Sequence, residues 1–398
     1  MPTLDLSRHI VIESGAIERL DELVAAKGGS RVFVIIDSFL ASPSVKLHEK
    51  VTAIFLKRGF ACSFFSNYAG EPTTKNVKEA VQQLQSFQAD CVVAVGGGSA
   101  IDLAKAVAVF SKNNEIKWSE ISCQQQLKRL PLIAVPTTAG TGSEATKIMV
   151  ITDPVTNVKM NPSHPDLIPD AAVLDPELTV SLPPSFTAYT GLDALTHAVE
   201  AYVSNRASQM TDLFALEAIR QIGLALPKAY EDGRDSDSRK DMILASCYAG
   251  LAFSNASTNL AHAAGRPLGA QFHIPHGLSV ALLLPFVLEF GLESCPERYA
   301  KVAVALGADP SLSTEKLAQA SIHIVEDYNE RFGIWKDASK YLQPEQLMQA
   351  IPSLVIDALS GNGIDTNRKV PADQDIAGIY EKLAEKIKET SQQTLLNN

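Results

Sequence analysis

The sequence predicts an α/β N-terminal domain with a parallel sheet, joined to an all-α C-terminal domain. Its 398 residues exceed the size at which one hydrophobic core usually stops growing, which favours two domains. Up to about residue 180, short β-rich runs alternate with helical patterns, as in βαβ units. Beyond that point, long segments rich in Ala and Leu recur at helical spacing. We therefore expect domains over residues 1–180 and 181–398.

Four apolar runs mark the expected strands, and three Ala- and Leu-rich segments mark the clearest helices. The runs are residues 31–37, 62–68, 91–95 and 130–137, and the helices are residues 188–202, 210–224 and 240–251. Three prolines within residues 175–184 discourage regular structure, so we place the domain boundary there. The charged residues 231–241 are interpreted as an exposed connection between helices.

Composition limits the partners of the chain. The net charge is −10, and no Lys/Arg stripe is present, which argues against nucleic acid and favours a small molecule. The five cysteines are far apart and odd in number, which suits a reducing cytoplasm. Residues 1–20 lack the pattern of a signal peptide, and the longest apolar stretch, residues 280–290, is too short for a bilayer. We expect a soluble cytoplasmic protein with no membrane partner.

A glycine-rich loop follows the third apolar run and precedes a helical pattern. Gly96, Gly97, Gly98 and Ser99 lie directly before the helical residues 100–110. Glycines let the backbone approach an anion closely, and a helix N-terminus offers unpaired N–H groups and a positive dipole. The loop therefore predicts pyrophosphate binding. Because GGGS matches neither GxGxxG nor the Walker loop, an ordinary strand-to-helix turn is the alternative.

A second loop of small residues, PTTAGTGSE, follows the fourth run. Its hydroxyl groups suit hydrogen bonds to phosphate or ribose, and they belong to Thr137, Thr138, Thr141 and Ser143. Two such loops after neighbouring strands support each other as a nucleotide site. The alternative for one loop alone is a Ser/Thr-rich turn that satisfies its own backbone.

Asp37 ends the first run, where dinucleotide folds place a carboxylate that takes the ribose hydroxyls and repels a 2′-phosphate. This residue favours NAD over NADP. Asp37 precedes the glycine loop, whereas the usual fingerprint places the acid about 20 residues after it. We therefore expect a strand order that differs from that of the common fingerprint.

Three of the eight histidines, in two Ala- and Gly-rich segments, are candidate metal ligands. In GLDALTHAVEAY, Asp193 and His197 are four residues apart and project from one helix face. In NLAHAAGRPLGAQFHIPHG, His262 lies on a helical stretch and His276 follows a proline. One carboxylate and three imidazoles suit Fe²⁺ or Zn²⁺ and leave room for a substrate oxygen. Taken singly, an Asp–His pair is more often a helix-stabilising contact, and a buried histidine is more often part of the core.

Together, the motifs resemble those of the iron-containing (group III) alcohol dehydrogenase family. GGGSAIDLAK, PTTAGTGSEAT, VITD, TGLDALTHAVEAY and HxxxRPLGxxxxxPHG occur in the family's order, and the match covers about residues 5 to 385. The resemblance implies an N-terminal dinucleotide-binding domain, a helical C-terminal domain and, frequently, a homodimer. It also implies NAD(H) and Fe²⁺ as cofactors, with Zn²⁺ as the alternative metal, and a small alcohol or aldehyde as substrate.

The resemblance also assigns residues. It implies that the metal is bound by Asp193, His197, His262 and His276. Its cofactor positions match Asp37, Glu71, Gly98, Ser99, Thr138, Thr141, Thr146, Lys159 and Leu178, to which the two loop motifs add Gly97, Asp102, Thr137 and Ser143. Glu71 stands where many relatives have Asn, and GGGSAIDLAK carries Ala100 and Leu103 where the family has Pro and Thr.

Arg266 is the most consequential departure. Many relatives carry at this position a histidine that is often assigned to proton relay, whereas Arg stays protonated near neutral pH. Four residues after His262, a helix would direct Arg266 at the same cavity, and its planar fork suits an oxoanion. We therefore expect an aldehyde or alcohol that bears a sulfonate, phosphonate or carboxylate, such as sulfoacetaldehyde. The alternative is a structural Arg paired to an acid.

Two further residues are candidates for roles at the reacting centre. His273 is a candidate for proton delivery, with a surface residue as the alternative. Phe253 is a candidate wall of an apolar substrate pocket, with a core residue as the alternative.

The predicted function is an NAD-linked, metal-dependent alcohol dehydrogenase or aldehyde reductase. The metal would act as a Lewis acid while hydride passes between the substrate carbon and the nicotinamide. One alternative is an NAD- and metal-dependent lyase of the dehydroquinate-synthase type, which would give no net NADH. An alternative of another class is a non-catalytic nucleotide-binding or assembly protein.

Overall fold

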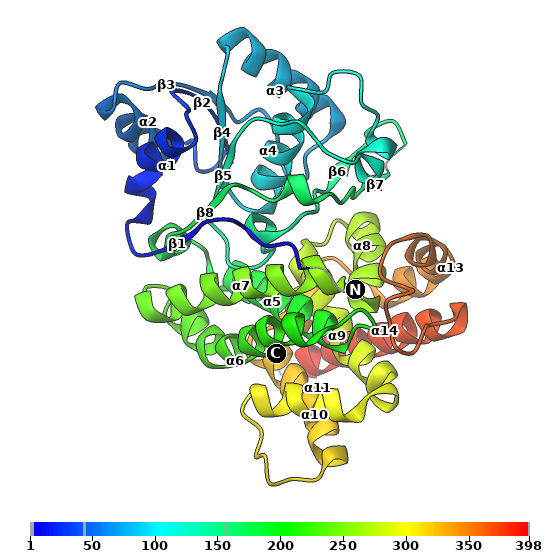
Figure 1. The fold of residues 1–398 in the computed structure, drawn as a ribbon. Coiled ribbons are helices and arrows are strands. Elements are labelled where there is room, and N and C mark those ends of the chain that lie inside the picture. The colour runs from blue at the N-terminus through cyan, green and yellow to red at the C-terminus, as the bar shows by residue number, and fades with distance from the viewer. Residues whose placement is uncertain (1–3, 43–44, 157, 397–398) are drawn as a thin grey trace. The chain divides into compact units, whose positions relative to one another are not determined.

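The computed structural model describes residues 4–42, 45–156 and 158–396 (Figure 1). The chain forms two compact units, one from Asp5 to Ser181 and one from Leu182 onward. The first unit is α/β and the second is helical among the described residues, which confirms the predicted fold class. Each unit is described by itself below.

The first unit is built on a six-stranded parallel sheet with the order β1-β8-β5-β4-β2-β3. The strands are β1 (Ile10–Ile12), β2 (Arg31–Ile36), β3 (Ala61–Phe65), β4 (Cys91–Gly96), β5 (Leu132–Pro136) and β8 (Ala171–Leu174). β2 to β5 correspond to the four expected runs, whereas β1 and β8 were not expected. A short antiparallel ribbon of β6 (Ile151–Thr152) and β7 (Lys159–Met160) lies outside the sheet.

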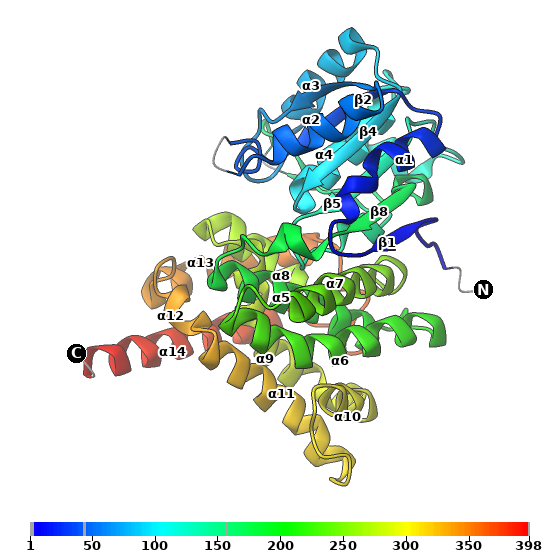
Figure 2. The same cartoon turned by 90° about the vertical axis from the view of Figure 1, so that its left-hand side faces the viewer.

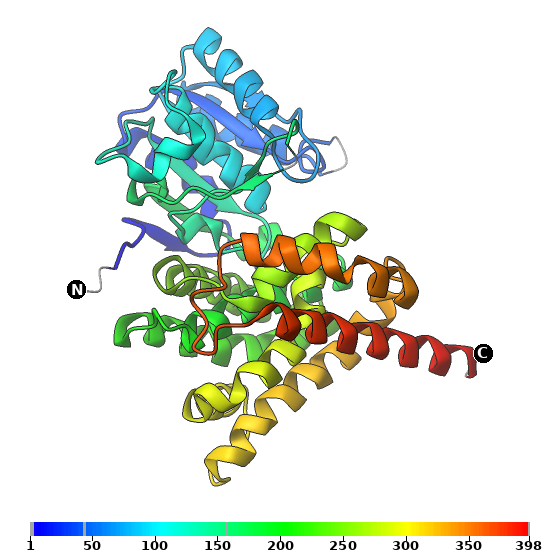
Figure 3. The same cartoon turned by 90° about the vertical axis from the view of Figure 1, so that its right-hand side faces the viewer.

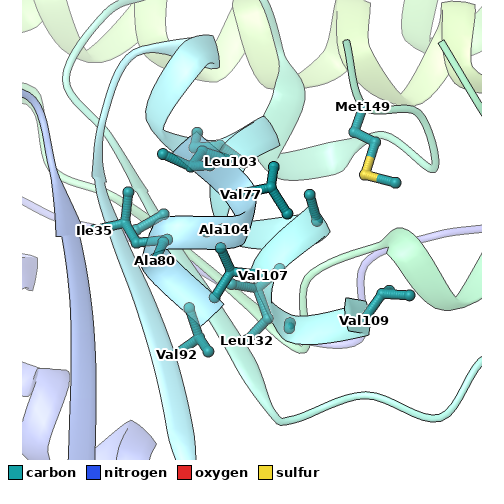
Figure 4. Packing of buried hydrophobic residues seen from close by; sticks show 14 of the residues in the cluster. Ile35, Val77, Ala80, Val92, Leu103, Ala104, Val107, Val109, Leu132 and Met149 are labelled. Carbon is teal, nitrogen blue, oxygen red and sulfur yellow. The ribbon is translucent and has the colours of Figure 1, made fainter. Parts of the chain in front are cut away.

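Helices cover both faces of this sheet. They are α1 (Leu20–Ala26), α2 (Leu47–Lys57), α3 (Thr74–Phe87) and α4 (Gly98–Phe110). On one face, Ile35 and Val92 of the sheet pack with residues of α3 and α4 such as Val107 (Figure 4). On the other face, Val34 and Val93 pack with residues of α1 and α2. Strands buried on both sides in this way read as continuous apolar runs, which is why β4 and β5 are visible in the sequence.

The second unit is a helical assembly (Figure 2 and Figure 3). Its helices are α5 (Pro184–Val203), α6 (Gln209–Glu231), α7 (Ser236–Ala256), α8 (Leu260–Phe272), α9 (His276–Gly291), α10 (Pro296–Ala305), α11 (Thr314–Arg331), α12 (Ile334–Ala338), α13 (Pro344–Ser360) and α14 (Asp373–Leu396). By length and composition alone, His276–Ser294 would suffice to cross a membrane. In the structure, α9 packs against α5, α8, α11 and α14, so its apolar residues form part of the core of this unit.

The charged segment 231–241 is largely helical, so its interpretation as an exposed connection was wrong for most of its length. α6 ends at Glu231 and α7 begins at Ser236, which leaves a connection of four residues. The Asp235 carboxylate accepts the backbone N–H groups of Asp237 and Ser238 and so caps α7. Arg239 is buried and donates to the Thr187 hydroxyl, which a reading of charge alone does not reveal.

Candidate metal centre and cofactor loops

Three helices of the second unit bring the predicted metal ligands together. Asp193 and His197 lie on α5, His262 lies in the first turn of α8, and His276 begins α9. The Oδ1 atom of Asp193 lies 3.4 Å from His262 Nε2 and 3.8 Å from His276 Nε2. It also lies 3.8 Å from His197 Nδ1. One carboxylate oxygen is therefore surrounded by three imidazoles.

Local packing fixes the start of α9 against α5. A Cβ atom at Gly277 would lie 2.3 Å from the backbone oxygen of Tyr189, so no side chain fits at that position. Pro275 holds the backbone directly before His276 in an extended conformation and serves as the N-cap of α9. His276 is therefore presented from a helix start that approaches α5 closely.

The donor set fits a divalent cation. Asp193 Oδ1 and His262 Nε2 are buried and have no hydrogen-bond partner among the described residues, which is costly unless a cation binds them. Burial would raise the pKa of Asp193, but His197, His262 and His276 outweigh burial and hold that pKa well below its usual range. One ionised carboxylate and three imidazole nitrogens are a set that Fe²⁺ and Zn²⁺ both accept.

Glu200 belongs to this site, although the sequence analysis did not single it out. Its Oε2 atom lies 2.6 Å from His262 Nδ1, and both side chains are buried. Because the Glu200 carboxylate accepts this hydrogen bond, Nδ1 carries a proton, and Nε2 is the nitrogen that faces Asp193. Burial alone would lower the pKa of His262, but Glu200 and Asp193 overcome it and raise that pKa to about 9.

The spacing of residues on α5 could have revealed Glu200. Asp193, His197 and Glu200 stand at positions i, i+4 and i+7, which share one helix face. Glu200 also accepts the backbone N–H groups of Asn259 and Ala261 at 2.9 and 2.6 Å. The same carboxylate therefore caps the start of α8 and orients the metal ligand of that helix.

The ring of His197 stacks on two other aromatic rings. The ring of Phe253, on α7, stacks on the ring of His197 with centroids 4.1 Å apart. The rings of His197 and His262 are stacked as well, at 4.2 Å. Phe253 is thus a buried residue that packs directly on a candidate ligand.

Arg266 lies one helical turn beyond His262 and is half-buried. Its Nη2 atom donates to the backbone oxygen of Asn362, in the loop that follows α13. Within the described residues, Arg266 forms no ion pair with an acid. The alternative that Arg266 is a structural residue paired to an acid therefore finds no such partner there. Burial lowers the pKa of Arg266, and Glu200 opposes this effect. His273 is the exposed C-cap of α8 and has a left-handed backbone.

In the first unit, the two predicted loops and Asp37 follow three adjacent strands. β4 pairs with β2 on one side and with β5 on the other, so the carboxyl ends of these strands meet at one edge. The Asp37 N–H donates to Val95 O, and the Thr137 N–H donates to Gly96 O. This edge is where open α/β sheets bind ligands.

The loops also touch each other. A Cβ atom at Gly98 would lie 2.9 Å from the side chain of Thr141, and one at Gly97 would lie 3.4 Å from that of Thr138. Gly97 is the N-cap of α4, so Gly98 and Ser99 form its first turn. The backbone N–H groups at the start of α4 are therefore presented beside the side chains of Thr138 and Thr141.

The remaining predicted cofactor residues contact other side chains of the first unit. Asp102, Ser143 and Thr146 take part in an internal hydrogen-bond network with Lys105. Lys159 Nζ lies 2.6 Å from Glu71 Oε1 in an ion pair. Leu178 is partly buried and packs against the core of the first unit.

Comparisons with known proteins agree with this architecture. Residues 7–176 match a family model described as iron-containing alcohol dehydrogenase, and residues 187–384 match one described as Fe-containing alcohol dehydrogenase family, C-terminal. The chain is 43% identical over 313 residues to the probable alcohol dehydrogenase EutG of Salmonella typhimurium, covering 78% of this chain and 79% of that protein.

Solved structures are similar over nearly the whole chain. A crystal structure of 1,3-propanediol oxidoreductase superposes with a TM-score of 0.91 at 30% identity, covering 96% of this chain and 100% of that one. A sulfoacetaldehyde reductase from Bifidobacterium kashiwanohense, solved in complex with NAD⁺, has a TM-score of 0.84 at 27% identity, covering 96% and 98%.

Proposed function

The chain belongs to the iron-containing alcohol dehydrogenase family, and on this premise we propose that it interconverts a short-chain alcohol and its aldehyde with NAD(H). The observation that carries the proposal is the convergence of three imidazoles on the buried Asp193 carboxylate, which has no other partner among the described residues at its Oδ1 atom. A protein that only binds nucleotides would not need this set of donors.

The metal would be held by Asp193, His197, His262 and His276. When bound, Fe²⁺, or Zn²⁺ in its place, supplies Lewis acidity toward a substrate oxygen. Glu200 keeps His262 in the tautomer that presents Nε2, and Phe253 shields one side of the cluster from water. His273, exposed at the end of α8, is the proposed group for proton exchange with solvent.

NAD(H) would be held at the carboxyl edge of the sheet in the first unit. We assign the pyrophosphate to the N–H groups at the start of α4, from Gly98 and Ser99. Asp37 would take ribose hydroxyls, and Thr138 and Thr141 would add hydroxyl donors from the second loop. The NAD⁺ complex of the similar sulfoacetaldehyde reductase supports this choice of dinucleotide.

The proposed substrate carries an oxoanion, and Arg266 would bind it. A half-buried guanidinium without an acid partner among the described residues retains donors for a sulfonate, phosphonate or carboxylate. It lies four residues after His262 on the same helix, at the spacing that shares a face. Sulfoacetaldehyde is the representative substrate, and the similar reductase of that aldehyde supports the idea.

Substrate comparison tests this assignment. The specificity constant kcat/KM should be measured for sulfoacetaldehyde and for propionaldehyde with the metal-loaded wild type and with Arg266→Met. Because hydrogen bonds to a charged group are lost, we expect the variant to lose roughly tenfold to a hundredfold with sulfoacetaldehyde and to change little with propionaldehyde. Equal losses on both aldehydes would reject the anion-binding role and leave the dehydrogenase assignment intact.

Net cofactor turnover separates the dehydrogenase from the lyase alternative. A dehydrogenase consumes one NADH for each aldehyde reduced, whereas a lyase with transient hydride transfer returns its cofactor unchanged.

We also propose a homodimer, to be tested by light scattering in solution. None of the five cysteines forms a disulfide, which supports a place in a reducing cytoplasm.

A further inference from the structure

The first unit buries a lysine that the proposed chemistry does not use. Lys105, on α4, has a relative exposure of 0%. Lysine is among the residues least often buried completely, because its ammonium loses its hydration. Asp102 lies one turn earlier on the same helix, with its Oδ1 atom 3.8 Å from Lys105 Nζ. A second acid, Glu144, is buried in the loop after β5.

The ammonium of Lys105 donates entirely to the second loop and its continuation. Its Nζ atom lies 3.1 Å from Ser143 Oγ, 2.9 Å from Thr146 Oγ1 and 2.6 Å from Ile148 O. The Ser143 hydroxyl accepts from Lys105 and donates to Asp102 Oδ1. These contacts join positions about 40 residues apart in the chain.

Asp102 completes the connection on the other side. Its Oδ2 atom accepts the Val150 N–H at 2.9 Å, two residues beyond the last residue that Lys105 contacts. Helix α4 therefore holds the segment 143–150 through two charged side chains. The start of the same helix carries the glycine loop, whose Gly98 touches Thr141.

We propose that Lys105 is a positioning residue for the dinucleotide, because with Asp102 it fixes the second loop against the glycine loop. The inference rests on the proposed function, since NAD(H) is the ligand assigned to those loops. Lys105 is buried, and it acts on the second loop through its hydrogen bonds with Ser143 and Thr146. It preorganises hydroxyl groups that would otherwise lose freedom on binding.

Lys105→Met keeps the length of the side chain and removes its donors. Removing one partner of a buried ion pair leaves the other charge unpaired and costs stability, so thermal melting must accompany the binding measurement. Lys117→Met, at an exposed lysine of the same unit with a side chain 78% exposed, is the matched control.

Binding of NADH, followed by its fluorescence, is the direct test. We expect the dissociation constant to rise roughly tenfold to a hundredfold in Lys105→Met and to stay unchanged in Lys117→Met. Metal affinity, a property of the helical unit, should be the same in all three proteins. Thr146→Val, which removes one acceptor at constant shape, should weaken NADH binding in the same direction and decides the matter if Lys105→Met does not fold.

The pH dependence gives a second readout that a structural role would not move. Burial lowers the pKa of Lys105 to about 8, against the opposing effects of Asp102 from α4 and Glu144 from the second loop. Burial also raises the pKa of Glu144 to about 7. If binding needs the ammonium, NADH affinity falls above pH 8, by up to about tenfold per pH unit. Lys105→Met should lack that fall.

Failure of the positioning role and failure of the cofactor assignment give different results in these experiments. Wild-type protein that binds NADH, with an unchanged dissociation constant in Lys105→Met or Thr146→Val, would overturn the positioning role alone. Wild-type protein that fails to bind NADH would overturn the assignment of the cofactor loops and this inference with it.

Discussion

Glu200 links two tasks through one carboxylate. It accepts three backbone N–H groups at the start of α8 and the Nδ1–H of His262, so the helix and its ligand are oriented together. Such a carboxylate raises the basicity of the imidazole and removes the freedom of the ring to rotate. The position of His262 Nε2 thus depends on a residue outside the predicted ligand set.

Replacement of this carboxylate should weaken metal binding. In Glu200→Gln, the shape and an acceptor oxygen are kept but the negative charge is lost, and we expect metal affinity to fall roughly tenfold to a hundredfold. Competition with a chelator measures the affinity. Glu231→Gln, at a glutamate of the same unit with a side chain 62% exposed, is the control. Equal affinities in the wild type and Glu200→Gln would show that Glu200 is only a helix cap.

Some of these residue roles can be predicted from the sequence, and others cannot. Asp193 and His197 stand out because their types and spacing suffice, and Glu200 follows the same face of α5. The partner of Arg266 does not follow from spacing. Asn362 is 96 positions away, and its backbone oxygen reaches Arg266 only because α13 packs against α8.

Elements of the fold are visible in the sequence where they are long and buried. β4 and β5 are buried throughout and give continuous apolar runs. β1 and β8 have three and four residues, too few to show a pattern, and they pair only with strands distant in the chain. Helix starts that are set by close packing, such as the start of α9 at His276, cannot be predicted from the sequence either.

The close approach of α9 to α5 leads to a prediction about the position of α9. In Gly277→Ala, the added Cβ would lie 2.3 Å from Tyr189 O, so α9 must shift and carry His276 with it. We expect destabilisation of about 1–3 kcal/mol and weaker metal binding. Thermal melting and chelator competition measure the two effects. Gly378→Ala, at a helical glycine with open space around it, should show neither loss.

At the scale of the whole molecule, metal binding and stability are coupled through protons. The pKa of His262 is raised to about 9 from its ordinary value of 6.5, so its protonated form stabilises the metal-free fold. That contribution is complete below pH 6.5 and is lost as the pH rises through about 9. The metal needs the unprotonated Nε2, so its affinity changes in the opposite sense.

The metal-induced rise in Tm should therefore grow with pH. Metal-free protein and protein with a fixed excess of Zn²⁺ would be melted at pH 6.5, 7.5 and 8.5. Over this range the affinity should increase by up to about tenfold per pH unit, because fewer protons must be displaced. An increment in Tm that is constant or that shrinks with pH would contradict the assignment of His262 as a ligand.

The pairing of β1 with β8 also bears on how the chain acquires its structure. Ile10 lies beside Ala172, and the Asp175 carboxylate accepts the N–H groups of Gly15 and Ile17. During synthesis the first strand therefore has no neighbour until the last strand of its sheet has left the ribosome. Contacts of such long sequence separation form slowly, and an unpaired strand edge invites association between chains. Mutations near residue 172 should consequently affect the yield of folded protein in cells more than the activity of the molecules that do fold.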